Sequence, residues 1–402
     1  MQNSQTAPRS PLTDGNVAAE RHYLVIYDRD EIDGLRDKYR GIAVDLKDLA
    51  EQALRSVPYS VFEKTGLAPS GHKHDYWHPA PYWWPDDTKP DGLPYVRRDG
   101  KRVPDTGFND AGRGQYDRTR LKAVFDDTTY LTIAARALGT PRFEAHAAAL
   151  VRTWFITPET CMTPHLRYAQ VRMGHNDNEG PGSGIIEFRD VFYFLDAVRL
   201  LEESGALTTE EVTAFRDWLR LYAEWLQTSK AGKRECKAVN NHGTFYDVQV
   251  GAIAAYLGDQ EIADEVCERL LQRLAIQFDP DGSQPQEIAR KDVRHYVCFN
   301  LYAWTMLARV VRAFGVDLWQ MRDAQGRCLE NAFAWLIRAD RQHKWSESGN
   351  AMFLTHRMAP LWRDCQQHWP ALDTVPDYSD VALERILYPN FDIVPLWGLT
   401  RR

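Results

Sequence analysis

The spacing of apolar residues predicts that most of the chain after about residue 118 is helical. The clearest segment is 208–232, where apolar side chains recur at intervals of three and four and so share one helix face. Thr208 and Glu211 form a capping box ahead of this stripe, and Gly232 follows its last turn. The stripe consists of Phe215, Trp218, Leu219, Tyr222, Trp225 and Leu226. We expect an amphipathic helix here.

Similar patterns recur along the chain and predict the fold class. Helical stretches are expected at 31–53, 185–203, 243–257, 260–277, 293–314, 326–339 and 359–368. Several of their starts recur at intervals of about 55 residues, the length of two helices with their turns. No strand ladder is evident. Stacked helix pairs build a solenoid or a closed ring, and we predict an all-α fold, an (α/α)n toroid or incomplete barrel of helix hairpins.

Two segments depart from the helical pattern. Residues 1–20 are polar and contain two prolines, which predicts a flexible N-terminal arm. Residues 71–107 are too rich in Pro, Gly and Asp for regular structure, and long irregular segments of compact proteins are commonly functional loops. We therefore expect a single domain over residues 21–402, in which 71–107 form a lid over a cleft.

Composition narrows the classes of partner. The chain has 402 residues, 44% of them hydrophobic, and a formal net charge of -7. This charge argues against nucleic acid as a general partner but allows a local basic cleft. No apolar run reaches the length of a membrane span. The polar opening has no signal-peptide core, which fits a cytoplasmic protein or one whose leader has been removed.

The cysteines indicate neither a disulfide framework nor a metal site. They are scattered, without CxxC motifs or histidine pairs at zinc spacing, so we expect buried free thiols and no bound metal. The six are Cys161, Cys236, Cys267, Cys298, Cys328 and Cys365.

The first candidate site is Asn240-Asn241-His242, directly before a predicted helix. The positive end of a helix, with its free N–H groups, favours an anion. His242 and Tyr246 are four residues apart and would share a helix face. The alternative is an N-cap followed by a histidine packed in the core.

The second candidate is the polar entry to the helix predicted at 293–314. So many polar side chains at a helix start suggest the floor of a cleft, although a solvated first turn with one tyrosine packed inward fits equally well. The residues are Gln286, Glu287, Arg290, Arg294, His295 and Tyr296.

The third candidate is the aromatic part of 71–107. Aromatic rings stack on sugars and guanidinium groups bind carboxylates, so this mixture suits an acidic polysaccharide. Alternatively, the aromatics simply fix their own loop in place. The side chains are Tyr76, Trp77, Tyr82, Trp83, Trp84, Arg97, Arg98 and Arg102.

Carboxylates in 176–190 allow a different chemistry. Paired carboxylates carry out glycoside hydrolysis, but acidic residues are also common at helix starts. The four are Asp177, Glu179, Glu187 and Asp190.

With these motifs, the chain resembles the alginate lyase superfamily of α/α-toroid polysaccharide lyases, in particular polysaccharide lyase families five and thirty-eight. The resemblance covers roughly residues 70–315. It rests on "YWWP" at 82–85, "GSGIIEF" at 182–188, "NNHGTFYD" at 240–247 and the Glu-x-x-Arg…Tyr run at 287–296. It implies that Asn241, His242 and Arg290 hold a uronate carboxylate and that Tyr296 acts on the sugar ring. It also implies a periplasmic or secreted protein.

One departure affects the arginine. In family five, the arginine and the tyrosine are seven residues apart, whereas Arg290 and Tyr296 are six apart and would diverge on a continuous helix. Either Arg290 lies in the turn before the helix, or Arg294 takes part of its role.

The function implied is metal-independent β-elimination of a 4-linked uronic-acid polysaccharide, alginate (polymannuronate) or glucuronan. Tyr296 would serve as base and acid, with nearby cations favouring its ionised form, and no cofactor is expected. The expected substrate-binding residues are Tyr82, Trp83, Trp84, Asn240, Tyr246, Glu287, Arg294 and His295. The alternatives are a glycoside hydrolase on the same toroid and a non-catalytic protein that binds acidic polysaccharides.

Overall fold

A computed structural model describes residues 23–98, 100–106, 115–342, 345, 351–372 and 393–401, without the side chains of 351–356. The arm predicted at 1–20 lies outside these residues. The described part is mainly helical, with four strands of two or three residues each. The prediction of an all-α toroid is therefore confirmed. None of the described helices is both long and apolar enough to cross a membrane.

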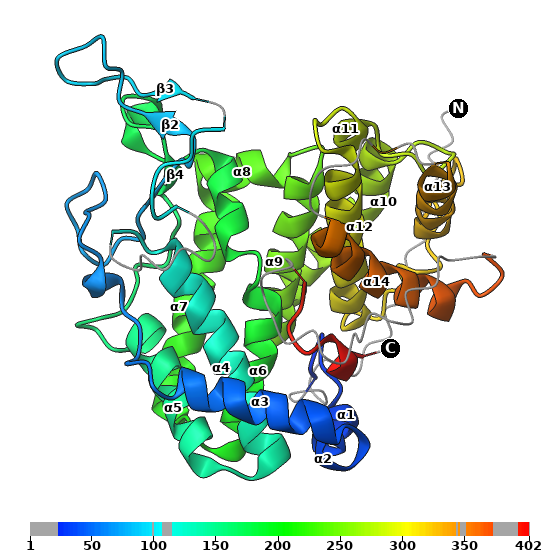
Figure 1. The fold of residues 1–402 in the computed structure, drawn as a ribbon, viewed down its shortest axis with the longest axis horizontal. Coiled ribbons are helices and arrows are strands. Elements are labelled where there is room, and N and C mark those ends of the chain that lie inside the picture. The colour runs from blue at the N-terminus through cyan, green and yellow to red at the C-terminus, as the bar shows by residue number, and fades with distance from the viewer. Residues whose placement is uncertain are drawn as a thin grey trace, which may run out of the picture.

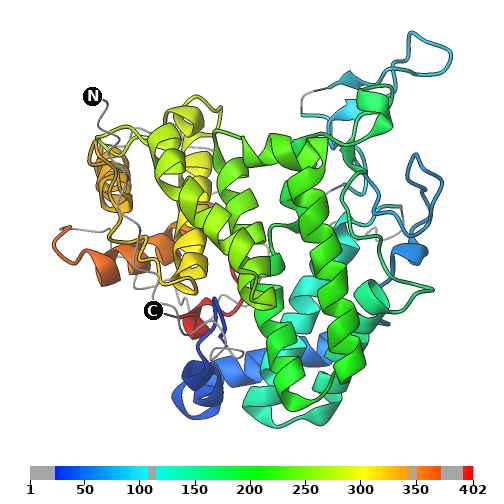
Figure 2. The ribbon, with the colours of Figure 1, turned by 180° about the vertical axis from the view of Figure 1, so that it is seen from behind.

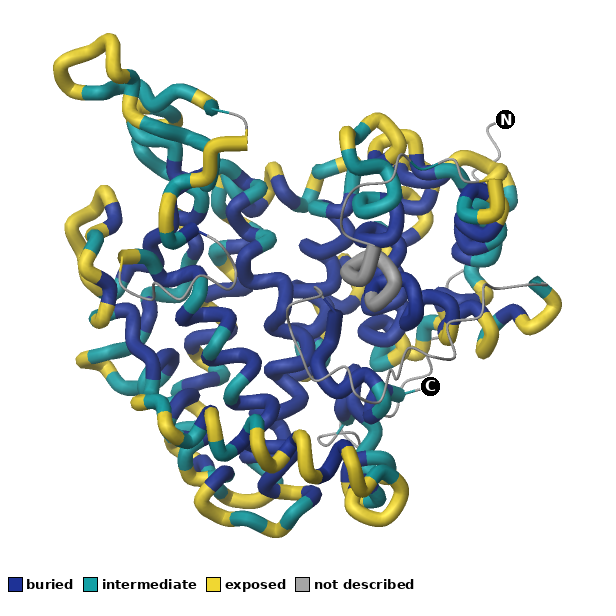
Figure 3. The backbone as a smooth tube through the Cα atoms, viewed as in Figure 1, coloured by how far each residue is buried: buried dark blue, intermediate teal, exposed yellow. Residues whose placement is uncertain are grey.

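The helices form an inner and an outer layer (Figures 1 and 2). Each inner helix packs against the next one along the chain and is buried on nearly every side, as Figure 3 shows by colour. The inner helices are α4 (Arg118–Leu138), α6 (Val191–Ser204), α9 (Asn241–Leu257) and α12 (Val293–Arg312).

The outer helices pack against the inner ones and bury a single stripe. They are α5 (Pro141–Val151), α7 (Thr209–Thr228), α10 (Gln260–Gln277) and α13 (Leu329–Arg341). In addition, α3 (Arg40–Ala53) covers α4, and α14 (Ala351–His368) packs against α12. The first predicted helix, 31–53, is divided into α1 (Arg29–Asp33), α2 (Leu35–Lys38) and α3.

The capping box predicted for α7 is present. The Thr208 hydroxyl accepts from the Glu211 N–H at 3.3 Å, and the Glu211 carboxylate accepts from the Thr208 N–H at 2.9 Å. The prediction that Gly232 follows this helix is wrong, because α7 ends at Thr228 and Gly232 lies within the next helix, α8 (Lys230–Cys236). A Cβ on Gly232 would lie 1.8 Å from the Leu226 carbonyl oxygen, so the sharp turn between the helices requires glycine there.

Shorter elements surround the helical layers. The helix predicted at 185–203 begins later, at Val191, after the 3₁₀ segment η4 (Gly182–Phe188). The four-residue helix α11 (Pro285–Ile288) precedes α12. The remaining short helical segments are η1 (Val61–Glu63), η2 (Arg152–Ile156), η3 (Asn176–Asn178) and η7 (Trp397–Leu399).

The prediction that residues 71–107 lack regular structure is wrong in part, because the segment contains three short strands. Its strand β1 (His78–Pro79) pairs in parallel with β4 (Ala169–Val171). Its strands β2 (Trp83–Trp84) and β3 (Val96–Arg97) pair antiparallel and project from the helical layers at the upper left of Figure 1. We call residues 82–102, with β2 and β3, the aromatic arm.

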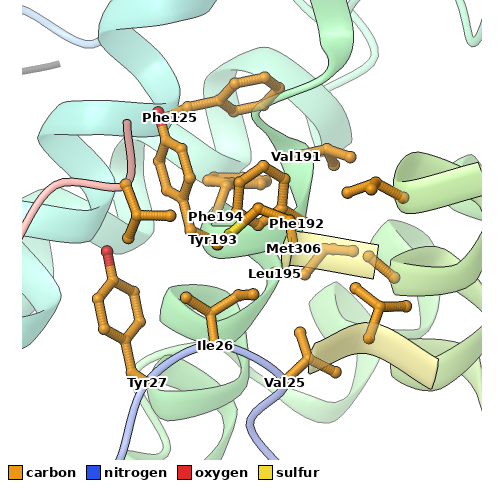
Figure 4. Close-up of a cluster of buried hydrophobic side chains, with 14 of the residues drawn as sticks. Val25, Ile26, Tyr27, Phe125, Val191, Phe192, Tyr193, Phe194, Leu195 and Met306 are labelled. Carbon is orange, nitrogen blue, oxygen red and sulfur yellow. The ribbon is translucent and has the colours of Figure 1, made fainter. Parts of the chain in front are cut away.

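The two ends of the described chain meet against the inner helices. The buried Asp196 carboxylate of α6 accepts from the N–H groups of Val25, Ile26 and Tyr27 at 2.8, 2.8 and 2.9 Å. The Arg401 N–H donates to the Ile26 carbonyl at 2.7 Å. In Figure 4, Val25 and Ile26 lie beside apolar side chains of α6 and Met306 of α12. These contacts join the first and last described segments of the toroid.

Candidate active site

The Asn240-Asn241-His242 turn lies at the start of α9. Asn240 is the N-cap, and its side-chain oxygen accepts from the His242 N–H at 3.3 Å. Arg273 of α10 fastens the turn by donating to the Ala238 carbonyl at 3.0 Å. A Cβ on Gly243 would lie 2.0 Å from the Arg273 Nη1 and 2.2 Å from the Ala238 oxygen. Glycine after the Asn-Asn-His triplet therefore admits the guanidinium that holds it.

A buried network of amides supports this turn from below. The Gln277 Nε2 donates to the Asn240 carbonyl at 2.8 Å. The Gln277 Oε1 accepts from Asn300 at 3.0 Å and from the Trp304 indole at 2.8 Å. Asn300 also donates to Gln284, at the start of α11, at 2.9 Å. The network therefore fixes the starts of α9 and α11 relative to each other, and buried polar groups satisfied in this way are rigid.

Asn241 and Glu287 bind each other across the starts of α9 and α11. Asn241 is 1% exposed, and its backbone N–H donates to the Glu287 Oε1 at 2.7 Å. Its Nδ2 lies 2.9 and 3.0 Å from the two oxygens of the same carboxylate. One N–H can cover both of these adjacent oxygens, so the second amide hydrogen remains for another acceptor. Glu287 thus orients Asn241.

His242 has its orientation set by a residue outside the predicted set. Its Nδ1 lies 2.6 Å from the Glu235 Oε1, and the two side chains are 22% and 4% exposed. A carboxylate at Nδ1 takes the hydrogen there, which leaves Nε2 unprotonated in the neutral ring. The His242 Nε2 can therefore accept a proton, or donate once the ring is charged.

Arg290 lies in the turn between α11 and α12, the first of the two placements considered. From there its guanidinium folds back over Tyr296, with the Cζ 3.7 Å from the ring centroid. Both residues are half-buried. The phenol and the cation therefore face the same space despite their six-residue spacing.

The groups around Glu287 influence its pKa. Burial raises the pKa of Glu287, opposed by its hydrogen bonds from Asn241 and by the charges of Arg290 and His242. Glu287 thus links these groups: it binds Asn241, the charges of Arg290 and His242 act on it, and Arg290 in turn covers Tyr296.

Arg294 and His295 precede Tyr296 in the sequence, and both side chains contact other residues. Arg294 donates to Asp340 at 2.9 Å, so its charge is already paired. The His295 ring lies 4.9 Å from the Tyr296 ring, and its Nδ1 accepts from the buried Arg357 at 2.9 Å.

An open pocket of about 740 Å³ lies beside His242. We call it the α8 pocket, because most of its wall comes from α8 and the turn that follows. Its lining residues are Pro181, Gly182, Ser183, Lys233, Arg234, Glu235, Lys237, Ala238, Val239, Asn240 and His242.

The aromatic arm carries a cation on each of its three predicted rings. Arg102 lies over Tyr82, and Lys101 over Trp84. Trp83 is covered by Arg172, whose Cζ lies 4.7 Å from the ring centroid. All three rings are half-exposed. Arg172 was not among the predicted residues, because it lies next to Trp83 only through the fold.

Several other residues of the predicted site are buried in the core or paired with other side chains. Tyr246 is buried and donates to the Leu226 carbonyl at 3.2 Å, so its side chain packs in the core. Tyr76 and Trp77 are buried as well. Arg98 forms an ion pair with Asp87.

Two of the four carboxylates considered for hydrolysis, Glu187 and Asp190, already have partners, whereas Asp177 is exposed. Glu187 is buried and accepts from Tyr76 at 2.6 Å, with the His78 ring also at 2.6 Å. Asp190 is buried and lies 3.4 Å from the Lys122 ammonium.

The cysteines are free thiols, and Cys298, Cys328 and Cys365 are buried. Within the described residues, no three His, Cys, Asp or Glu side chains cluster closely enough to hold a metal ion.

Comparison with known families decides the class of the protein. The family model described as alginate lyase matches residues 60–345, well over half of the chain. The chain belongs to the alginate lyase family. This family member is a polysaccharide lyase, and the resemblance drawn from the sequence is confirmed.

Two solved structures are among those similar to this chain. An alginate lyase from Bacteroides ovatus is 30% identical, with a TM-score of 0.75 over 88% of this chain and 96% of that one. Alginate lyase A1-III from Sphingomonas species A1 is 16% identical, with a TM-score of 0.49 over 84% of this chain and 90% of that one. Comparison with curated proteins found no match.

Sequence reasoning about this lyase missed the α8 surface, although a signal was present. Lys230, Lys233, Arg234 and Lys237 are spaced by three and four, which predicts one basic helix face. The Glu235–His242 pair had no such signal, because a turn separates the two residues.

Proposed function

We propose that this lyase cleaves alginate by β-elimination at the joined starts of α9, α11 and α12. The observation that carries the proposal is the stacking of Arg290 on Tyr296, together with the action of the Arg290 charge on Glu287, which holds Asn241. A base removes the C5 proton, the C4–O4 bond breaks, and a C4=C5 double bond forms. Tyr296 accepts the C5 proton as phenolate and returns a proton to O4.

Neutralising the substrate carboxylate is the main electrostatic task. Removing the C5 proton would build a second negative charge on a group that already carries one. Preorganised donors lower the cost of that charge. Asn241 offers its second amide hydrogen, His242 its Nε2 when charged, and Arg290 its guanidinium. Because Glu287 and Glu235 fix the first two side chains, little reorganisation is needed during the reaction.

The stereochemistry of the sugar assigns different work to Tyr296 and His242. In β-D-mannuronate, H5 and O4 lie on the same side, so Tyr296 alone serves as base and acid. In α-L-guluronate the C5 configuration is inverted, and a group on the opposite side must take the proton. His242 suits that task, because Glu235 holds its Nδ1 and leaves Nε2 as the acceptor.

Alginate is the preferred substrate because of the family match and the likeness to the alginate lyase of B. ovatus. Glucuronan, whose sugar differs from mannuronate only at C2, presents the same H5 and O4 arrangement and stays in the test. We also propose a periplasmic or secreted location, on the resemblance noted from the sequence.

The hydrolase alternative needs two available carboxylates. Glu187 is already bound by Tyr76 and His78, and Asp190 lies beside Lys122, which favours a structural role for both. The binding-protein alternative predicts no chemistry at all.

A spectroscopic assay separates these possibilities. The protein is incubated with polymannuronate, alginate and glucuronan, and the ultraviolet absorbance of the unsaturated product is followed. We expect absorbance to rise with alginate. New reducing ends without absorbance would indicate a hydrolase, and the absence of both would reject the proposal.

A further inference from the structure

Helix α8 directs three basic side chains into the pocket beside His242. Lys233, Arg234 and Lys237 are exposed, and all three line the α8 pocket. Within the part of the chain that the structure describes, none of the three forms an ion pair. By contrast, Arg269 and Arg273 on the neighbouring α10 both pair with Asp247.

The acidic residue of α8 does not cancel this charge. Glu235 also lines the pocket, but its carboxylate is 4% exposed and is bound to the His242 ring. The charged groups of the pocket are therefore three exposed cations and one buried carboxylate already engaged by an imidazole. Such a surface attracts anions, and concave surfaces strengthen that attraction.

Small residues beside α8 complete the lining of the pocket. Gly182 of η4 packs so closely on α8 that a Cβ there would lie 2.8 Å from the Ala231 carbonyl oxygen. Pro181 and Ser183 flank it. At about 740 Å³ the pocket lies within the range of roughly 300–1,000 Å³ typical of ligand sites. A pocket of this volume can hold a sugar ring.

We propose that the α8 pocket is a second uronate subsite, which binds the carboxylate of a sugar unit adjoining the one at His242 and Tyr296. This inference rests on the proposed function, because a polyuronate carries one carboxylate on every sugar. His242 and Asn240 belong to both places, so a chain held at the reacting centre continues into the pocket. The three basic side chains of the pocket contact a sugar unit that does not react, so they contribute chiefly to substrate binding and little to the rate of the chemical step.

The test is a neutral triple variant, Lys233→Gln with Arg234→Gln and Lys237→Gln. At low salt we expect KM for polymannuronate to rise about tenfold or more, while kcat falls much less. We also expect KM of the variant to depend less on NaCl than that of the wild type, because salt screens exposed charges.

A matched control removes the same charge elsewhere. Arg40, Lys47 and Arg55 are exposed residues in and just after α3, at the lower edge of Figure 1, and have no ion pair within the described chain. Their triple glutamine variant should keep the wild-type KM and salt dependence. An α8 variant with unchanged KM and salt dependence, or an α3 control with the same loss, would overturn the subsite.

A second variant changes the pocket outside α8. Ser183→Asp adds a carboxylate to the pocket that the cations line, and we expect a higher KM at low salt that approaches the wild-type value as salt is raised. Unchanged KM in this variant would also count against the subsite.

Failure of the proposed function is distinguishable from failure of the subsite. If the wild type releases no unsaturated product, β-elimination is rejected, and the subsite is tested by calorimetric binding of polymannuronate. Weaker binding by the α8 variant than by the α3 control would still support an anionic subsite. Equal binding would reject it.

Discussion

Tyr296 and Arg290 form a contact that their spacing in the sequence argued against. On one continuous helix, residues six apart point in different directions. The chain leaves α11 at Ile288 and enters α12 at Val293, and this turn lets the Arg290 guanidinium fold over the ring. The family resemblance identified the two residues from the sequence, whereas their contact is visible only in the tertiary structure. Their catalytic roles stay a prediction.

Tyr296→Phe removes the proposed acid and base but keeps the ring on which Arg290 stacks. We expect kcat on alginate to fall by a factor of about 10²–10⁴, with polymer binding retained. Product absorbance and calorimetric binding measure the two effects. Tyr39→Phe, in the turn before α3, is the matched control and should leave both unchanged. Wild-type turnover by the Tyr296 variant would exclude this tyrosine as the base.

Glu287 was expected to bind substrate, but it is buried and engages Asn241 instead. Glu287→Gln puts an amide N–H₂ opposite at least one N–H donor of Asn241. We expect a loss of about 1–3 kcal/mol in the free energy of unfolding, together with lower kcat, because Asn241 is no longer held in place. Urea unfolding and the absorbance assay measure these effects. Glu261→Gln, exposed on α10, should change neither, and a Glu287 variant that behaved like it would contradict the positioning role.

At the scale of single elements, periodicity predicted the long helices well. The stripe and capping box of α7, and the extents of α10 and α12, follow the pattern closely because their packing depends on that pattern. The breaks at Gly34 and Tyr39 and the separate helix α8 were missed. They depend on close approaches, such as that of Gly232 to the Leu226 carbonyl, which leave no periodic trace.

Gly243 tests whether the start of α9 sets the position of Asn241 and His242. Gly243→Ala forces a Cβ against the Arg273 guanidinium and the Ala238 carbonyl. We expect a loss of about 1–3 kcal/mol in the free energy of unfolding and at least a tenfold loss of kcat/KM.

The control for this variant is Gly205→Ala, after the last turn of α6. Gly205 has φ 79° and open space around it, so alanine there costs backbone strain without a clash. It should lower stability and leave kcat/KM unchanged. If both variants lost activity in proportion to stability, the α9 turn would have no special role.

Over the whole molecule, the site joins the start of α9 to α11 and the turn before α12, which lie more than 40 residues further along the chain. The aromatic arm, α8 with the start of α9, and the turn before α12 each carried a local signal. For the aromatic arm, the start of α9 and the turn before α12, the sequence alone offered two explanations, because nothing local shows which side chains face solvent. The burial of the side chains in the structure distinguishes the two explanations. Tyr246 and Tyr76 lie in the core, whereas Trp83 and His242 are accessible.

Asp196 makes the attachment of the N-terminal segment depend on pH. Burial raises the pKa of Asp196 from 3.8 to about 6, against the opposing effect of its three backbone hydrogen bonds. Between these values the folded protein binds the proton more tightly than the unfolded chain does. This group therefore lowers the free energy of unfolding as pH rises from about 4 to 6, by roughly 3 kcal/mol in all.

Asp196→Asn tests this effect. The variant should be less stable overall, because an N–H₂ group replaces one carboxylate oxygen and faces at least one of the N–H groups of Val25, Ile26 and Tyr27. Its free energy of unfolding should nevertheless not show the decrease that Asp196 causes in the wild type as pH rises from 4 to 6. Urea unfolding across this range, with the exposed Asp48→Asn as control, measures the difference. Parallel pH profiles for wild type and the Asp196 variant would contradict the shift.

The pairing of Ile26 and Asp28 with Arg401 and Leu399 has a consequence for biosynthesis. Residues near 26 leave the ribosome early, whereas their partners near 400 are translated more than 370 positions later. The nascent chain can stack its helices in order as they emerge, but its first segment has no strand-like neighbour until translation has passed residue 401. The contact between the two segments therefore forms only after the residues near 401 have been translated.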